Sequence, residues 1–169
     1  MNARAIAAAI FTLLTLAVLP AFAPGQTAHA AAAFAPAQLA AFPRGQMTVE
    51  RAKGRDSFQI WIADTPDRQQ QGLMWLRELP ADYGMVFVLA EIRPMNMWMK
   101  NTYVPLDMLF FGSDGRILSI ARNTQPLSLA IIESGAPVAG VVEIRGGEAQ
   151  RRGIAVGDRV RWAAGAPKL

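Results

Sequence analysis

The chain has 169 residues, of which 52% are hydrophobic and 18% charged, a composition that excludes wholesale disorder. This length allows one domain of ordinary size, and the formal net charge at pH 7 is a modest +4. The sequence contains no cysteine, which excludes disulfides, thiolate metal sites, cysteine nucleophiles and lipid anchors on cysteine.

The amino terminus has the features of a secretory signal peptide. Residues 1–4 include a positive side chain, residues 5–23 form an almost purely apolar run, and an A-x-A triplet, AHA, occupies 28–30. This order predicts a signal peptide over 1–30, removed by cleavage, and therefore a periplasmic or secreted protein without a permanent membrane anchor. The alternative is a membrane-spanning anchor, because about 19 apolar residues can cross a bilayer.

His29, the only histidine of the chain, lies inside the predicted signal peptide. The mature chain would then contain neither histidine nor cysteine. Catalytic Ser-His-Asp and Cys-His arrangements, histidine general bases and nearly all conventional zinc sites are thereby excluded. We expect no cofactor, and the sequence leans away from an enzyme.

A single domain is predicted over 47–162. Residues 31–46 are rich in Ala, Pro and Gly and are predicted to form a flexible tether, and residues 163–169 a tail. The first strand is predicted over 58–63, where Phe, Ile and Ile alternate with other residues.

A short helix is predicted next, over 67–75. Asp64 or Thr65 can cap it and Pro66 suits its first turn, whereas the glutamine run that follows resembles an ordinary helix surface. The sequence SDG at 113–115 is a strong hairpin turn. The remaining predicted elements are strands over 85–89, 106–111, 116–122, 138–144 and 159–162, an extended segment over 96–101, and a second short helix over 148–152.

Strands dominate this pattern, and the long crossover helices of a doubly wound parallel sheet are missing from it. The sequence therefore predicts a mainly β (α+β) fold. We expect a small antiparallel barrel-like or rolled sheet of about seven strands with one or two short helices, one of them plugging an end.

Several blocks of this sequence resemble one protein family. They are ADTPDRQQQGLM (63–74), GMVFV (84–88), MWMKNTYVPLDMLF (97–110) and EIRGGEAQRRGIAVGDRV (143–160). They resemble the bacterial and archaeal family catalogued as domain of unknown function 192. The resemblance implies a single small β-rich domain, often exported behind a signal peptide, and it supplies no established activity.

Three methionines alternate along the predicted extended segment. If this segment is extended, Met95, Met97 and Met99 share one face, and each lies roughly 7 Å from the next along the chain. Thioether sulfurs suit Cu(I), to which an exported protein can be exposed. Methionine is more commonly a core filler packed on aromatic rings. A Met-based Cu(I) site is therefore the weakest of three candidate functions.

Polar residues between 98 and 107 are the best candidates for a ligand pocket. Trp98, Lys100, Asn101 and Asp107 are predicted to line it, with Glu143 as a weaker candidate. Asp107 lies among apolar residues, and the turn before it would bring it towards Lys100. Lys100 and Asn101 would then bind an anionic or carbonyl group, while Asp107 would orient Lys100 or exchange a proton. The competing interpretation is a structural ion pair between Lys100 and Asp107.

Three functions follow from these observations. The first is a soluble periplasmic binding or accessory module without classical catalysis, whose partner is an unknown small molecule or envelope component. The second is an acid/base enzyme that acts on a cell-envelope substrate through Asp107 and Lys100. The third is the Cu(I)-binding protein. Arginines at 151, 152, 159 and 161 form a basic end that is interpreted as a solvated face, and nucleic acid is not an expected partner.

Overall fold

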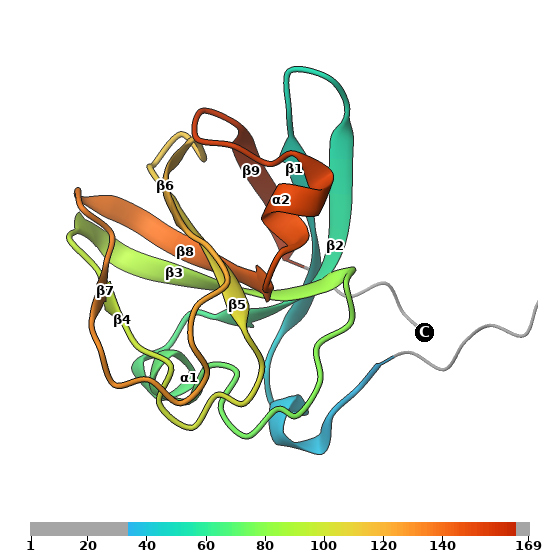
Figure 1. Ribbon diagram of the computed structural model, residues 1–169, viewed down its shortest axis with the longest axis vertical. Helices are drawn as coiled ribbons and strands as arrows, with labels where there is room; N and C mark the ends of the chain where they lie inside the picture. The colour runs from blue at the N-terminus through green and yellow to red at the C-terminus, as the bar shows by residue number, and fades with distance from the viewer. Residues whose placement is uncertain (1–33, 165–169) are drawn as a thin grey trace, which may run out of the picture. The chain divides into compact units, whose positions relative to one another are not determined.

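The computed structural model describes residues 34–164 and is dominated by strands (Figure 1). Its helical segments are the 3-10 turn η1 (Ala37–Leu39) and the helices α1 (Pro66–Gln71) and α2 (Glu148–Arg152). Its strands are β1 (Arg44–Glu50), β2 (Arg55–Ala63), β3 (Tyr83–Arg93), β4 (Asn96–Met97), β5 (Leu106–Phe111), β6 (Ile117–Ala121), β7 (Ile132–Glu133), β8 (Val138–Arg145) and β9 (Arg159–Ala164).

Seven strands form one sheet in the order β6-β5-β8-β3-β2-β1-β9, while β4 and β7 form a separate two-stranded ribbon. The two outer strands of the large sheet approach each other at one end. There Ile117 N–H donates to the Asp158 carbonyl at 2.8 Å, and Val160 N–H donates to the Gly115 carbonyl at 2.8 Å. The sheet is therefore curled into a half-barrel (Figure 1), and the predicted mainly β fold with one or two short helices is confirmed.

One strand pair departs from the antiparallel pattern. β2 and β3 run parallel, with Gln59 opposite Tyr83 and Ala63 opposite Phe87. Parallel neighbours require a crossover connection. The chain between β2 and β3 supplies it with α1 and the loop that follows. This crossover is what places α1 beside the ends of both strands.

Alternating side chains build two apolar clusters on the two faces of the sheet. One cluster, here called the inner cluster, includes residues of α2 and of the closing strands; the other, the outer cluster, includes residues of the loop after α1. The inner cluster contains Met47, Phe58, Ile60, Leu109, Val142 and Ala149, among others. The outer cluster contains Trp61, Leu73, Met85, Phe87, Met108 and Phe110, among others.

The segment ahead of β1 differs from the predicted tether over 31–46. From residue 34 onward it is packed: Leu39 is fully buried and Phe42 nearly so. The Phe34 ring lies edge-on to Trp61 at 6.1 Å and to Tyr83 at 5.4 Å between ring centroids. Phe34, Leu39 and Phe42 thus pack on the outer cluster. This apolar contact explains why an Ala- and Pro-rich stretch is ordered there.

The predicted signal peptide over 1–30 and its cleavage point lie outside the described residues. Within 34–164, none of the helices is both long enough and apolar enough to cross a membrane. The hairpin predicted around the SDG turn forms between β5 and β6, and the Asp114 carboxylate accepts the N–H of Arg116 at 2.9 Å.

Candidate functional site

Local sequence determines where α1 begins and ends. The Thr65 hydroxyl accepts the N–H of Arg68 at 3.4 Å, so that of the two predicted capping residues it is Thr65 that caps the helix. Gly72, with a φ of 49°, ends the helix. A side chain there would meet the ring of Phe87, because an added Cβ would lie 3.1 Å from it. The helix is therefore shorter than the predicted 67–75.

Gln69 holds α1 against the sheet. Its side-chain amide donates to the carbonyl of Ala63 at 3.2 Å and to that of Val88 at 2.8 Å, at the ends of the parallel pair β2–β3. The next residues, Gln70 and Gln71, lie on the side of the helix that faces the site. The glutamine run is therefore more than the helix surface predicted from sequence, because one member anchors the helix and the others line a cavity.

The segment after β4 is a turn, and the extended conformation predicted over 96–101 holds only for Asn96–Met97. Asn101 has a φ of 55°, and Thr102 N–H donates to the Met99 carbonyl at 3.1 Å. Trp75 N–H donates to the Asn101 carbonyl at 2.8 Å, and Trp75 itself has a φ of 68°. Two non-glycine residues in the left-handed region therefore face each other across one hydrogen bond.

Glu143 is the most unusual titratable residue of the fold. It lies on the central strand β8, where its register neighbours are Met85 on β3 and Met108 on β5, both fully buried. Glu143 itself is 4% exposed, and burial raises the pKa of its carboxyl to about 8. Within 34–164 no hydrogen bond or ion pair reaches this carboxyl. At neutral pH Glu143 is therefore an uncharged acid surrounded by apolar side chains.

A narrow pocket leads to Glu143. Its volume is about 30 Å³, and its lining includes Gln71, Phe87, Met97, Trp98, Lys100 and Thr102. The only enclosed polar side-chain atom without a partner in the described part of the chain is Trp61 Nε1. The Glu143 oxygens also lack a hydrogen-bond partner among the described residues, but they are not fully enclosed. They therefore keep contact with the open space of the pocket.

A wider groove adjoins this pocket. It has a volume of about 460 Å³, and its lining includes Asp67, Gln70, Trp75 and Asn101. Gln70, Gln71, Met74, Trp98 and Lys100 line both cavities. Trp75 is 53% exposed and Trp98 44% exposed, and the Lys100 ammonium lies 5.3 Å from the centre of the Trp98 ring. The groove is thus lined by two exposed indole rings and by the polar side chains of Asp67, Gln70, Gln71, Lys100 and Asn101.

Asp107 is not part of this site, contrary to prediction. It is fully buried, and by strand alternation it faces the inner cluster with Leu109. Its two carboxylate oxygens accept the backbone N–H groups of Asn123 at 2.7 Å and of Ala149 at 2.8 Å. Asp107 does not approach Lys100 as predicted, because Lys100 lies by the other face of the sheet, where it lines the pocket with Glu143. Asp107 instead holds the first turn of α2.

The structure thus brings together four of the five residues predicted for the pocket. Trp98, Lys100 and Glu143 line the narrow pocket, and Asn101 lines the adjoining groove. Glu143, the weaker candidate from sequence, has the central position. The predicted pair of Lys100 with Asp107, on which an acid/base enzyme was based, is wrong.

The methionines of the predicted Cu(I) face are buried in the outer cluster. Met95 and Met97 are nearly inaccessible, and Met99 is fully buried. The Met99 sulfur accepts the hydroxyl of Thr124 at 3.1 Å. These contacts are those of core-filling methionines, and no shared, open face of three sulfurs exists for an ion to approach.

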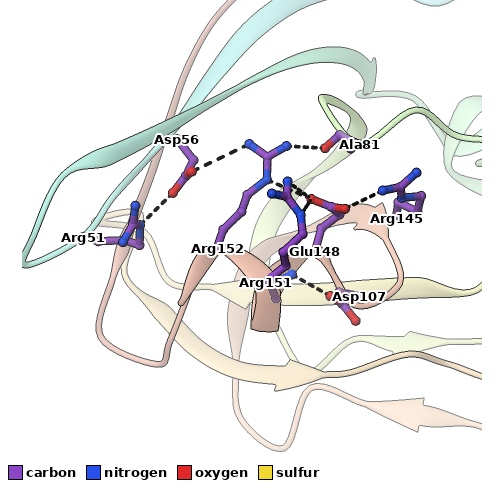
Figure 2. Close-up of polar contacts among 9 residues, drawn as sticks. Arg51, Asp56, Ala81, Asp107, Arg145, Glu148, Arg151 and Arg152 are labelled. Carbon is purple, nitrogen blue, oxygen red and sulfur yellow. Dashed lines mark hydrogen bonds and ion pairs between the residues drawn. The ribbon is translucent and has the colours of Figure 1, made fainter.

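A second polar cluster lies on α2, where Figure 2 shows three arginines around Glu148. Glu148 is buried, and its carboxylate pairs with Arg145 at 2.6 Å, with Arg152 at 3.0 Å and also with Arg151. Burial opposes the ionisation of Glu148, but the hydrogen bonds from Arg151, Arg145 and Arg152 outweigh it and lower its pKa to about 2. Arg152 also donates to the Ala81 carbonyl at 2.6 Å, so this cluster ties α2 to the loop before β3.

We expect Glu148→Gln to lower the free energy of unfolding at pH 7 by roughly 2–3 kcal/mol. The pKa of Glu148 is lowered in the folded state, so its contribution is present above its ordinary pKa of 4.5 and is lost as the pH falls towards about 2. Urea unfolding at pH 7 and pH 3 should show the gap between wild type and variant narrowing in acid. The control Glu50→Gln removes an exposed ion pair with Arg161 and should change stability by less than about 1 kcal/mol. A gap that is equal at both pH values would contradict this account.

Sequence reasoning missed Trp75, Gln70 and Gln71 as residues of the site. Trp75 follows a helix-ending glycine closely, and a large exposed aromatic residue beside such a break was the available signal. The contact between Trp75 and Asn101 joins segments 26 positions apart and depends on two left-handed residues, which no periodicity reveals.

Two solved structures are similar to this chain over most of its length. One is a protein from Novosphingobium aromaticivorans DSM 12444 described as being of unknown function, with 38% identity, a TM-score of 0.72, and coverage of 82% of this chain and 100% of the other. The second is a protein from Sinorhizobium meliloti 1021 provisionally described as a transcription regulator, with 43% identity, a TM-score of 0.70, and coverage of 72% and 95% respectively. No curated protein matches the chain.

A family profile settles the relationship suggested by the sequence blocks. The profile of domain of unknown function 192, described as uncharacterized ACR, COG1430, matches residues 48–162, which contain β2 to β8 and both helices. The matched region holds every residue of the pocket around Glu143. The chain therefore belongs to the family of domain of unknown function 192.

Proposed function

We propose that the protein is an exported binding module that takes a small ligand into the groove beside α1 and the turn at 98–102. A polar group of the ligand would enter the narrow pocket and meet the carboxyl of Glu143. The observation that carries this proposal is a buried carboxyl, without a partner among the described residues, at the floor of a pocket that opens to solvent.

The stability of the fold does not account for Glu143. Between Met85 and Met108 an apolar side chain of similar length would pack without the desolvation that a carboxyl undergoes. Buried polar groups are normally hydrogen-bonded, and those that are not are frequently functional. A ligand group in the pocket would supply the missing hydrogen bond, since a protonated carboxyl can both donate and accept.

Export is part of this proposal and is supported by the signal peptide predicted over 1–30. The small ligand is favoured over nucleic acid by the way the arginines are paired. Arg151 and Arg152 pair with Glu148, and Arg161 pairs with Glu50. These ion pairs engage the guanidinium groups and offset part of their charge, so that fewer of them are free to contact phosphates.

A second candidate function is acid/base catalysis in the same pocket, with Glu143 in place of the predicted Asp107 and Lys100. The observation in its favour is the raised pKa of Glu143, about 8, which suits a general acid at neutral pH. Turnover of the ligand on the isolated protein would distinguish this enzyme from a binding module.

The test compares three proteins made with their own leader and purified from the periplasm: wild type, Glu143→Met and Leu129→Ala. Glu143→Met keeps the volume and apolar surroundings of β8 and removes the polar group, while Leu129 is exposed and lies outside the groove. Small molecules released on denaturation are identified by mass spectrometry. We expect a compound in wild type and in Leu129→Ala that is absent from Glu143→Met. Equal amounts in all three proteins, or none in any, would contradict the proposal.

A further inference from the structure

We propose that the ligand is a neutral sugar, whose ring lies against Trp98 and Trp75 and whose hydroxyl or hydroxymethyl group enters the pocket above Glu143. This inference rests on the proposed function and names the ligand class of the same site. Three features of the site carry it: the aromatic walls, the balance of charge and the size of the inner pocket.

The aromatic walls are large, exposed and held in place. Trp75 and Trp98 are 53% and 44% exposed, although both lie in a concave part of the surface. The backbone of Trp75 is fixed by its hydrogen bond to Asn101, and its ring packs against Tyr103 at 6.2 Å between centroids. Indole rings are flat apolar platforms with a polar edge. A sugar ring has one face of C–H groups that can lie on such a platform, while its hydroxyls point outward.

The charges of the site favour a ligand without net charge. The groove contains one carboxylate, Asp67, and one ammonium, Lys100, and the two balance each other. Glu143 at the pocket floor is uncharged at neutral pH. A strongly anionic ligand would meet Asp67, and a quaternary ammonium would meet Lys100, which already occupies the face of Trp98 at 5.3 Å.

The uncharged polar groups match hydroxyls. Gln70, Gln71 and Asn101 line the groove and carry amides, which can donate to and accept from the same hydroxyl. The Gln71 amide nitrogen already donates to the Gln38 carbonyl at 2.7 Å, so its oxygen is oriented as an acceptor. Several short, mixed donors and acceptors around an apolar platform are what a polyhydroxylated ring requires.

The size of the inner pocket limits what reaches Glu143. Its volume of about 30 Å³ admits one or two groups of about the size of water. A hydroxymethyl or hydroxyl group fits, whereas a phenyl or a phosphate group does not. The adjoining groove of about 460 Å³ lies within the range of small-ligand sites and can hold the ring itself.

The test follows the indole N–H signals of the full-length protein by two-dimensional ¹H–¹⁵N NMR. The chain has four tryptophans, and the structure puts only Trp75 and Trp98 in the groove, while Trp61 is buried and Trp162 packs on Phe111. The probes are cellobiose, N,N′-diacetylchitobiose, citrate, choline and benzyl alcohol, each titrated to tens of millimolar. We expect one of the two sugars to shift the Trp75 and Trp98 signals saturably and to leave Trp61 unmoved.

Variants sharpen the result. Trp98→Leu should weaken sugar binding at least about tenfold, Glu143→Met should weaken it as well, and Leu129→Ala should leave it unchanged. Thermal melts of the same variants separate lost binding from lost folding. Saturable shifts with citrate, choline or benzyl alcohol but with neither sugar would overturn the sugar assignment and leave the binding site in place. No shift with any probe would overturn both the sugar assignment and this site as a ligand site.

Discussion

The free energy of unfolding of the wild-type protein should fall by roughly 3–5 kcal/mol between about pH 4.5 and pH 8, and Glu143→Gln should abolish this decline. Burial raises the pKa of Glu143 from 4.5 to about 8, so over this interval the folded state holds a proton that the unfolded state has released. Stability falls with rising pH wherever the folded state binds more protons. The decline should therefore be steepest in the middle of the interval and level off above pH 8.

Urea unfolding of wild type and Glu143→Gln at pH 5, 6, 7 and 8 measures this difference. The two proteins should be similar in stability near pH 5, and the variant should be the more stable at pH 8. The matched control is Glu91→Gln, an exposed residue of β3, which should follow the wild-type curve. Glu148 does not interfere, because its pKa of about 2 places its contribution at lower pH. Parallel curves for wild type and Glu143→Gln would show that the Glu143 carboxyl is solvated or paired.

Asp107→Ala is expected to destabilise the protein by about 3–5 kcal/mol. The side chain is fully buried and accepts two backbone N–H groups, from Asn123 and from Ala149. Its removal leaves both donors without a partner, and a buried orphaned donor costs about 1–3 kcal/mol. Asp107→Asn keeps one acceptor oxygen, so this substitution should lower the free energy of unfolding by about half as much as Asp107→Ala.

Lys100→Ala is the comparison that separates two accounts of Asp107. Lys100 is exposed, and its described contact is with the Trp98 ring, so its loss should change stability by less than about 1 kcal/mol. Because the two residues lie on opposite faces of the sheet, the effects of the single substitutions should add in the double variant. Thermal or urea unfolding of the four proteins decides this. If the double variant loses clearly less stability than the two single variants lose together, Asp107 and Lys100 interact, as the ion pair predicted from sequence requires.

The sequence by itself determined the fold class and the local boundaries. Alternation over 58–63, the capping Thr65 with Pro66, and the SDG turn each depend on neighbouring residues, and each is found where it was predicted. The short helix over 148–152 was also predicted with its observed bounds. Such features are local because propensity, capping and turn geometry act over a few residues.

The tertiary structure decided which side chains meet. Strand alternation places Glu143 on one face of its strand, but only the order β5-β8-β3 makes that strand central and surrounds the carboxyl with Met85 and Met108. Asp107 accepts the N–H of Ala149, 42 positions away, and no local sequence pattern indicates this hydrogen bond. Burial and pairing arise from strand order and from what covers each face of the sheet. They belong to contacts between distant segments, which a local pattern does not encode.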